Sequence, residues 1–466
     1  MAQKLKVSII GAGSAQFSLT MVKDLCLTDN LRGSHVTFMD IDEERLDMIY
    51  HLARRYSEQL GSNLTFEKTT DRAAALQGAD YVINTGYVLG HVVEANLRDL
   101  CSRYGYYHFG GALGPYHQFW LMLSVAQDIE KICPNAWLIQ VGNPVFHGCT
   151  LMTRETSTQI IGLCHGHYGY LEVANVLGLD PEKVTWEAPG LNHNIWLTKF
   201  EYEGKDAYPL LDEWIATQGE AYWRDHRAKS THDAQMSRGA CNEYRLYGLM
   251  PIGDTVRRGG WWYHTDINTK KRWFGEPFGG PDTHIARPYF VKNLEANIAK
   301  MIAASKDPHF DLVGTVGKEH SREQIAPIID ALSFDNAGDF QINVPNRGGK
   351  LHGIPENVVV EVPAHIDAQG IHIKDFTQLP QKILLNHVMP EWLEMERDLY
   401  AFQSGDKAML LWQLLNEHQT RSYDLAVSLL EELLTHAEVS EVEDFEKFKP
   451  EERIASFFKH AKPLIS

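Results

Sequence analysis

The sequence lacks long apolar runs, an excess of basic residues and any sign of export. A membrane-spanning helix needs about 20 consecutive apolar residues, and no stretch of the 466 residues approaches that length. The formal net charge of −17 argues against nucleic acids and anionic membranes as partners. The first residues are basic, as in a signal peptide, but the apolar stretch behind them is short and enters a glycine turn. We therefore expect a cytoplasmic protein.

Paired cysteines are absent as well. The six cysteines are scattered, at positions 26, 101, 133, 149, 164 and 241. Without a Cys-x-x-Cys pair, neither a disulfide framework nor a structural zinc site is favoured. Repeats, low-complexity tracts and flexible linkers are also missing. The apolar fraction of 44% is ordinary for a globular protein, and the length predicts two closely packed domains.

The segment from residue 6 to residue 25 organises the chain. An apolar stretch rich in branched residues ends at Gly11 and Gly13, and a helical pattern follows. This predicts a buried strand, a tight turn and a helix. Gly11 permits the turn, and Gly13 and Ser14 lie where a pyrophosphate can approach the positive end of the helix.

A second strand, at residues 36–39, ends at Asp40. That carboxylate is placed to accept hydrogen bonds from a ribose. Two features depart from the usual fingerprint, because Gln16 replaces the third glycine and Asp40 follows Gly11 by more than about 20 residues. Since strand, helix, second strand and acid occur in the expected order, we predict a dinucleotide-binding site.

Strands and helices alternate through the first part of the chain and predict a Rossmann-type, doubly wound parallel sheet. Within this part, residues 86–118 contain several glycines and aromatics and suggest a mobile loop above the sheet. From about residue 184 the pattern predicts antiparallel strands and then long amphipathic helices over 380–437. We expect a cofactor-binding domain over 1–190 and an α+β domain for substrate and oligomerisation over 191–466.

Polar side chains follow three of the later strands, where ligands bind in such sheets. The groups are Asn143, Cys164-His165-Gly166-His167 and Gly190-Leu191-Asn192-His193. A thiolate and an imidazole, from Cys164 and His193, suit a borderline metal such as zinc or manganese. Two protein ligands leave positions open for substrate oxygens, which predicts a catalytic metal site.

Other interpretations of these residues stay open. Cys164 can be a small buried hydrophobe, and His193 can be a hydrogen-bonded core residue. Cys164 can also be a hydrolase nucleophile with His165 as its base. However, neighbouring residues on a strand point to opposite faces, so that pair needs a bend in the backbone.

The order of motifs resembles glycoside hydrolase family 4 over essentially the whole chain. In addition to the groups above, the motifs are Gly11-Ala12-Gly13-Ser14, Asn143-Pro144, Gly253-Asp254-Thr255, Asn343-Val344-Pro345-Asn346 and Glu361-Val362-Pro363. The resemblance implies a fold like that of the lactate and malate dehydrogenases. It also implies a need for NAD+ and a divalent metal, commonly Mn2+, in place of paired carboxylates.

The four residues from Cys164 are similar to those of the α-uronidases, α-glucuronidase above all and α-galacturonidase next. The resemblance implies that NAD+ takes a hydride from C3 of the sugar, which acidifies the C2 proton. A base removes that proton while the metal stabilises the enediolate. The glycosidic oxygen then leaves, water adds, and the hydride returns, so that the net reaction is hydrolysis.

Carried over by position, the resemblance implies that Cys164 and His193 bind the metal and that Asn143 holds the substrate. His165 occupies the position of the leaving-group acid, and Asp254 that of the base. The reserve candidates for the base are Tyr244, Tyr247 and Tyr263.

A uronic acid should be held by a cation, preferably an arginine. We expect Arg257, Arg258 or His167 to bind its carboxylate. The segment 114–118 lacks the acid and the arginine that the family often carries there, so no role is assigned to it.

The leading hypothesis is an NAD+- and Mn2+-dependent α-glucuronidase that acts on a small acidic oligosaccharide, as a homodimer or homotetramer. The alternatives within the family are an α-galacturonidase and a neutral α-glucosidase or α-galactosidase. A malate-type dehydrogenase would instead accumulate NADH with its product. A nucleotide-sensing binding protein would bind NAD+ and cleave no glycoside.

Overall fold

A twelve-stranded mixed sheet runs through the computed structural model, which describes residues 4–108 and 114–435. Half of the sheet is parallel, in the order β3-β2-β1-β4-β5-β6. These strands are β1 Lys6–Ile10, β2 His35–Met39, β3 Thr65–Thr69, β4 Tyr81–Asn84, β5 Trp137–Gln140 and β6 Gln159–Gly162. This is the strand order of a Rossmann sheet, as the alternating pattern predicts.

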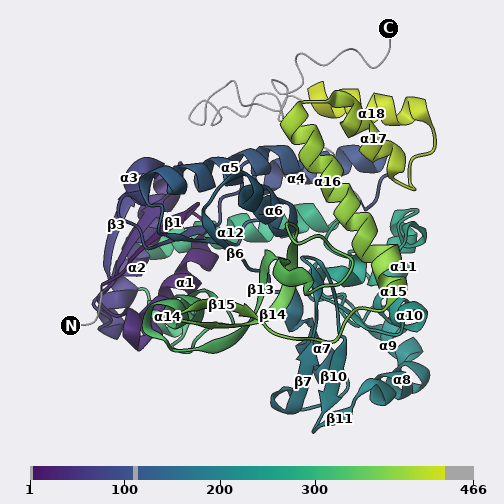
Figure 1. The fold of residues 1–466 in the computed structure, drawn as a ribbon, viewed down its shortest axis with the longest axis horizontal. Helices are drawn as coiled ribbons and strands as arrows, with labels where there is room; N and C mark the ends of the chain where they lie inside the picture. Colours follow the sequence, from purple (N-terminus) through teal and green to yellow (C-terminus); the bar gives the residue numbers. More distant parts are fainter. Residues whose placement is uncertain (1–3, 109–113, 436–466) are drawn as a thin grey trace.

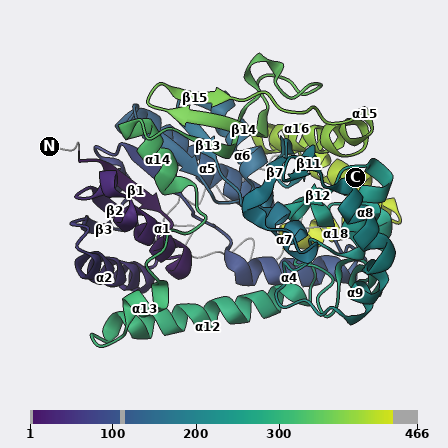
Figure 2. The same cartoon turned by 90° about the horizontal axis from the view of Figure 1, so that it is seen from below.

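Helices cover both faces of the parallel half (Figures 1 and 2). They are α1 Ala15–Leu27, α2 Glu43–Leu60, α3 Arg72–Leu76, α4 Gly90–Arg103, α5 Gly114–Ile132 and α6 Val145–Glu155. The central strands β1 and β4 are buried almost throughout, as is typical of strands covered on both sides. The long α12 Ala286–Lys306 packs across α2 and α4 and runs along one edge of the molecule (Figure 2).

The prediction of a mobile loop over residues 86–118 is wrong for most of that segment. Residues 90–103 form α4, and α5 already begins at residue 114. Leu97, Leu100 and Cys101 are buried on one face of α4, so an apolar face at helical spacing lies between the glycines. The rest of the predicted loop includes residues 109–113, which lie outside the described part.

The sheet continues beyond β6 in antiparallel strands. They follow in the order β13 Gly338–Pro345, β14 Val359–Asp367, β8 Gly190–Leu191, β9 Asn194–Trp196 and β12 Pro251–Ile252, while β15 Gly370–Ile373 pairs with β14. A separate sheet contains β7 Val184–Glu187, β10 Lys199–Tyr202 and β11 Lys205–Asp206. The twelve-stranded sheet contains strands from both predicted domains. The domain boundary at residue 190 therefore stays a prediction.

Short helices surround the antiparallel part. They are α7 Gly169–Val176, α8 Tyr208–Thr217, α9 Gly219–Asp225, α10 Arg238–Tyr247, α11 Ile267–Phe274, α13 Leu312–Val316 and α14 Ile325–Phe334. The sequence pattern predicts one helix over 208–224 and one strand over 194–202, whereas the structure has the two helices α8 and α9 and the two strands β9 and β10 there. The pattern did not predict α7, α10 or α11.

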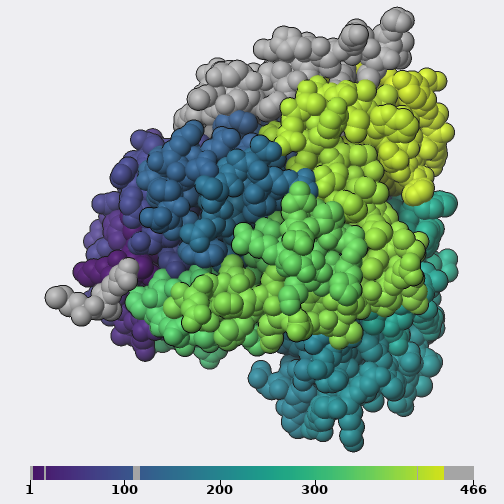
Figure 3. All heavy atoms as spheres, viewed as in Figure 1, coloured from purple at the N-terminus to yellow at the C-terminus, as the bar shows by residue number. Residues whose placement is uncertain are grey.

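Helices end the described chain, as the amphipathic pattern over 380–437 predicts. They are α15 Gln381–Ile383, a π-helical turn Leu384–Val388, α16 Met389–Ser404, α17 Lys407–Asn416 and α18 Tyr423–Thr435. Their yellow-green surface lies against the blue surface of the Rossmann part in Figure 3. Within the described residues, no helix combines the length and the apolar character that a membrane span requires.

Candidate functional site

The turn after β1 places the predicted cofactor residues together. Gly11 has a φ of +79°, and a Cβ atom there would lie 2.5 Å from the backbone of Gly86, so glycine is required. The Gly13 N–H donates to Asp40 Oδ2 at 2.6 Å, and burial raises the pKa of Asp40. Ser14 is exposed beside them. The carboxylate at the end of β2 therefore lies against the glycine turn.

The ends of β4 and β5 adjoin this turn. Thr85 Oγ1 donates to the Gly11 carbonyl at 2.8 Å, and Gln118 Nε2 donates to the Gly86 carbonyl at 2.7 Å. Asn143 follows β5 and is exposed. The carboxyl ends of three parallel strands thus share one edge, where ligands bind in sheets of this kind.

A cavity of about 700 Å³ opens at this edge and is lined by Gln118, Asn143, Asn194 and Arg258, among others. Its acidic wall residues are Glu94, Glu391, Glu394, Asp398 and Glu417. Its size is that of a small-molecule site. Cys164 and His193 are not among the residues that line it, although Asn194 directly follows His193.

The charge of Asp254 acts on both Cys164 and His193. Cys164 follows β6 and is half-buried, and burial, followed by the charges of Glu361 and Asp254, raises the pKa of its thiol to about 12. His193 has a φ of +67° in the turn between β8 and β9, a region that non-glycine residues seldom adopt. Its Nε2 lies 3.0 Å from Asp254 Oδ2. Asp254 is therefore paired with His193, and its charge also affects the Cys164 thiol.

Glu361 and Asn343, from two of the motifs in the sequence, lie next to the segment that carries the Cys164 thiol. The carboxylate of Glu361 accepts from Asn192 Nδ2 at 2.9 Å and from Asn343 Nδ2 at 3.3 Å, and the Asn192 side chain also hydrogen-bonds Cys164. Burial raises the pKa of Glu361 to about 7. The motif residues 343 and 361 thus support the site from the adjoining strands, and a carboxylate within the apolar run of β14 is the signal that could have assigned this role to Glu361.

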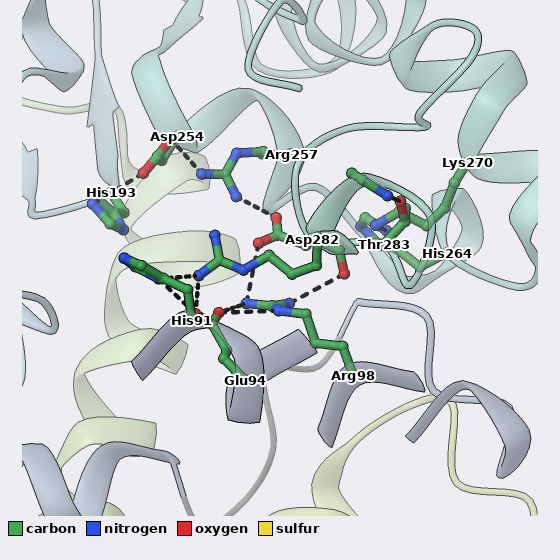
Figure 4. A network of polar contacts seen from close by, with 12 residues as sticks. His91, Glu94, Arg98, His193, Asp254, Arg257, His264, Lys270, Asp282 and Thr283 are labelled. Carbon is green, nitrogen blue, oxygen red and sulfur yellow. Dashed lines mark hydrogen bonds and ion pairs between the residues drawn. The ribbon is translucent and has the colours of Figure 1, made fainter. Parts of the chain in front are cut away.

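A chain of ion pairs extends from Asp254 to α4 (Figure 4). Arg257 lies 2.5 Å from Asp254 Oδ1 and also pairs with Asp282. Asp282 lies 3.5 Å from Arg98, which donates two hydrogen bonds to Glu94. Burial raises the pKa of Asp254, but Arg257 and then His193 outweigh it and hold that pKa well below its ordinary value. Asp254 is therefore an ionised, firmly oriented carboxylate.

His165 and His167 have different surroundings. His165 is exposed and its Nε2 lies 2.7 Å from Glu323 Oε2, and this hydrogen bond raises the pKa of His165. His167 is buried, and its ring lies 5.6 Å from that of Trp186 in a stacked arrangement. Burial lowers the pKa of His167 to about 3, so a neutral His167 packed among aromatics is poorly placed to bind a carboxylate.

Of the two candidate arginines, Arg258 lines the cavity and pairs with Glu391. Arg257 is held between two carboxylates. Of the reserve tyrosines, Tyr247 lines the cavity, whereas the Tyr244 hydroxyl donates to Asp212 and Tyr263 accepts from Asn242.

The donor set at Cys164 and His193 fits a metal held by few protein ligands. Cys164 forms no disulfide, and a thiolate with an imidazole suits a borderline divalent ion. Across residues 4–108 and 114–435, no group of three or more His, Cys, Asp or Glu side chains could hold a metal ion. A metal bound here would keep positions open for substrate, as catalytic sites do.

Two family models match the chain. The model "Family 4 glycosyl hydrolase" matches residues 6–179, and the model of the C-terminal domain of the same family matches residues 188–420. An α-galacturonidase of Thermoanaerobacter italicus is 23% identical over an alignment of 466 residues, gaps included. The alignment spans 93% of this chain and 96% of that protein. An α-galactosidase of Bacillus subtilis is 31% identical over 222 residues, 44% of this chain and only half the length of that protein.

Solved structures confirm the predicted fold class. A 6-phospho-α-glucosidase from gut microorganisms, crystallised with NAD and Mn2+, has a TM-score of 0.75 at 18% identity and covers 93% of this chain and 98% of its own. Lactate dehydrogenase from Eimeria maxima has a TM-score of 0.50 at 16% identity and covers 87% of this chain and 97% of its own. The match to a dehydrogenase agrees with the Rossmann strand order.

Proposed function

The chain belongs to family 4 of the glycosyl hydrolases, and we propose that it cleaves an α-linked uronic acid from a small glycoside. The observation that carries the proposal is the pairing of His193 with Asp254, whose charge also acts on the Cys164 thiol that follows β6. Between the two uronic acids we favour galacturonide over the glucuronide expected from the sequence, because the relative matched over 93% of the chain is an α-galacturonidase.

The cofactors proposed for this chain are NAD+ and Mn2+. Gly11, Gly13, Ser14 and Asp40 would hold the dinucleotide, and the glycine at position 11 keeps the turn free of a side chain. Cys164 and His193 would hold the metal. When bound, the two cofactors would supply oxidation at C3 of the sugar and stabilisation of the negative charge that forms on its oxygens.

The side chains then have separate roles. Asn143 lies in the cavity wall and would hold the sugar hydroxyls. Asp254 is ionised and fixed by Arg257, and we assign to it the removal of the C2 proton. His165 is exposed and paired with Glu323, and we assign to it the proton for the leaving oxygen.

Arg258 is the cation that we assign to the carboxylate of the substrate. It lines the cavity, and it is more exposed than Arg257, with 31% against 13% of the side chain accessible. Arg257 is engaged by two carboxylates, and His167 lies in an aromatic cluster, so both are weaker candidates. Glu391 already pairs with Arg258. The planar guanidinium has enough N–H groups to bind a substrate carboxylate beside Glu391.

The experiment is a screen of p-nitrophenyl α-glycosides, acidic and neutral, with NAD+, Mn2+ and a reducing thiol. We expect release of nitrophenol from an α-uronide without net accumulation of NADH, and a slower reaction with deuterium at C2 or C3. Arg258→Ala should lower kcat/KM for the uronide far more than for the neutral glycoside with the same leaving group. An equal loss on both substrates would refute the role of Arg258.

The same screen separates the other candidate functions. A malate-type dehydrogenase would form NADH in proportion to product, and a nucleotide-sensing protein would bind NAD+ and release nitrophenol from none of the glycosides. Cys164→Ser should abolish Mn2+ binding measured by calorimetry, whereas Cys149→Ser, at a buried cysteine in α6, should leave it intact. Equal Mn2+ affinity in the two variants would remove Cys164 from the metal site.

A further inference from the structure

Two tryptophans form part of the cavity wall and remain accessible to a ligand. Trp261 and Trp262 are 47% and 42% exposed, and both line the cavity. In contrast, Trp196 and Trp214 are buried in the core. Large aromatic rings that stay accessible inside a concave site offer a flat, apolar contact to a ligand.

The backbone and neighbouring rings fix these two side chains. A Cβ atom at Gly260 would lie 2.1 Å from the ring of Trp262, so the glycine lets that ring lie directly on the main chain. The rings of Trp261 and Trp262 are 6.3 Å apart at an angle of 77°, and Trp261 lies 6.4 Å from the ring of His418. They therefore present two differently oriented flat surfaces to the cavity.

Acidic side chains accompany the tryptophans. Glu394 of α16 and Glu417, just after α17, line the same cavity. In the described part of the chain neither forms an ion pair, whereas Glu391 is paired with Arg258. Burial raises the pKa of Glu394 and raises that of Glu417 to about 8, so a protonated Glu417 can donate a hydrogen bond to a hydroxyl group as well as accept one. This part of the wall therefore suits a neutral ligand with many hydroxyls and an apolar face.

We propose that Trp261, Trp262, Glu394 and Glu417 form the subsite for the leaving group, and that this leaving group is a neutral sugar unit. The faces of a pyranose that carry only C–H bonds stack on the indoles, and its hydroxyls form hydrogen bonds with the two carboxyl groups. The proposal rests on glycosidase activity but not on the identity of the sugar whose bond is cleaved. A cavity of about 700 Å³ has room for two sugar units.

The test compares two substrates that share the sugar accepted in the screen above. One is its methyl glycoside, and the other is a disaccharide with a neutral hexose as leaving group. We expect Trp261→Ala and Trp262→Ala to lower kcat/KM at least tenfold on the disaccharide and less than threefold on the methyl glycoside. Trp412→Ala is the matched control, because Trp412 is 55% exposed in α17 and does not line the cavity. An equal loss on both substrates would overturn the proposal.

The charge of the leaving group allows a second test of the proposed subsite. At pH 9, where Glu417 with its pKa of about 8 is mostly ionised and repels an anion, a disaccharide with a uronic acid as leaving group should be at least tenfold poorer than the neutral one, and Glu417→Gln should narrow that gap. If wild-type enzyme prefers the acidic leaving group, the subsite is wrong even when the first sugar is a uronic acid. If neutral glycosides replace uronides in the screen, the proposed function fails while this comparison still decides the subsite.

A binding measurement is independent of turnover. A neutral methyl hexoside should quench tryptophan fluorescence in a saturable way in the wild type and in Trp412→Ala. The quenching should disappear in the variant with both Trp261 and Trp262 replaced by alanine. Identical saturable quenching in that variant would overturn the proposal.

Discussion

Asp282 should stabilise the fold through two arginines at once. It pairs with Arg257 and lies 3.5 Å from Arg98, and the accessible fractions of these three side chains are between 11% and 16%. Asp282→Asn keeps the shape of the side chain and removes its charge. Breaking a buried ion pair by removing one partner costs roughly 3–5 kcal/mol.

The lower end of that range applies here, because each arginine keeps another carboxylate. Arg257 keeps Asp254 and Arg98 keeps Glu94. We therefore expect Asp282→Asn to lower the free energy of unfolding by ~3 kcal/mol. Reversible urea unfolding followed by tryptophan fluorescence measures this change. Asp375→Asn is the matched control, because Asp375 is 96% exposed in its pair with Lys350 and exposed pairs contribute between about 0 and 1 kcal/mol.

The pH dependence gives the reasoning a second test. Burial raises the pKa of Asp282, but Arg257 and Arg98 outweigh it, and the folded-state pKa lies well below the ordinary value. The stabilisation is therefore fully present above the unfolded pKa of about 4 and is lost as the pH falls below it. A change within about 0.5 kcal/mol at pH 7, the range of an ordinary surface substitution, would refute the reasoning.

The remaining predictions concern cofactors, pH and the fold. Gly11→Ala should lower NAD+ affinity at least tenfold by calorimetry, because its Cβ meets Gly86, whereas Gly178→Ala, also at positive φ with no atom within 4 Å, should not. Chelation with EDTA should abolish glycosidase activity and Mn2+ should restore it; full activity after chelation would contradict the metal site. Burial raises the pKa of Glu172 to about 7. The contribution of the protonated side chain to folding stability is therefore complete below pH ~4.3 and is lost as the pH rises through 7. Glu172→Gln should flatten the pH dependence of Tm over this range. Asn346 is fully buried and makes three hydrogen bonds of 2.7 to 2.9 Å to the main chain, so Asn346→Ala should cost ~3 kcal/mol in urea unfolding, and a loss below 1 kcal/mol would show that water replaces these bonds.

Local sequence patterns were sufficient to predict most strands and helices of the parallel half of the sheet. β1 and β2 are parallel neighbours, so the glycine turn after β1 and the residue after β2 lie at the same edge of the sheet. The order of these elements in the sequence was therefore sufficient to predict that Gly13 lies beside Asp40. The structure pairs His193 with Asp254, while the joint role of Cys164 and His193 as metal ligands stays a prediction. α4 was missed because glycines and aromatics were given more weight than apolar residues at helical spacing.

Contacts between distant segments could not be predicted. Glu361 approaches Cys164 across three strands, and Glu323 approaches His165 from a segment 158 residues away. Nothing in the local sequence around Glu361 or Glu323 specifies these partners. Likewise, the amphipathic pattern of α16 and α17 shows that each helix has a buried face, but it does not show that Glu394 and Glu417 border the same cavity.

The seam between β6 and β13 has a mechanical consequence. Gly162 faces Asn343 so closely that a Cβ atom on the glycine would lie 2.9 Å from the Cβ of the asparagine and 2.6 Å from the Val145 side chain. The parallel and antiparallel halves of the sheet therefore touch at this seam with no room for a side chain at position 162, so Gly162→Ala would have to push β6 away from β13 or displace Val145.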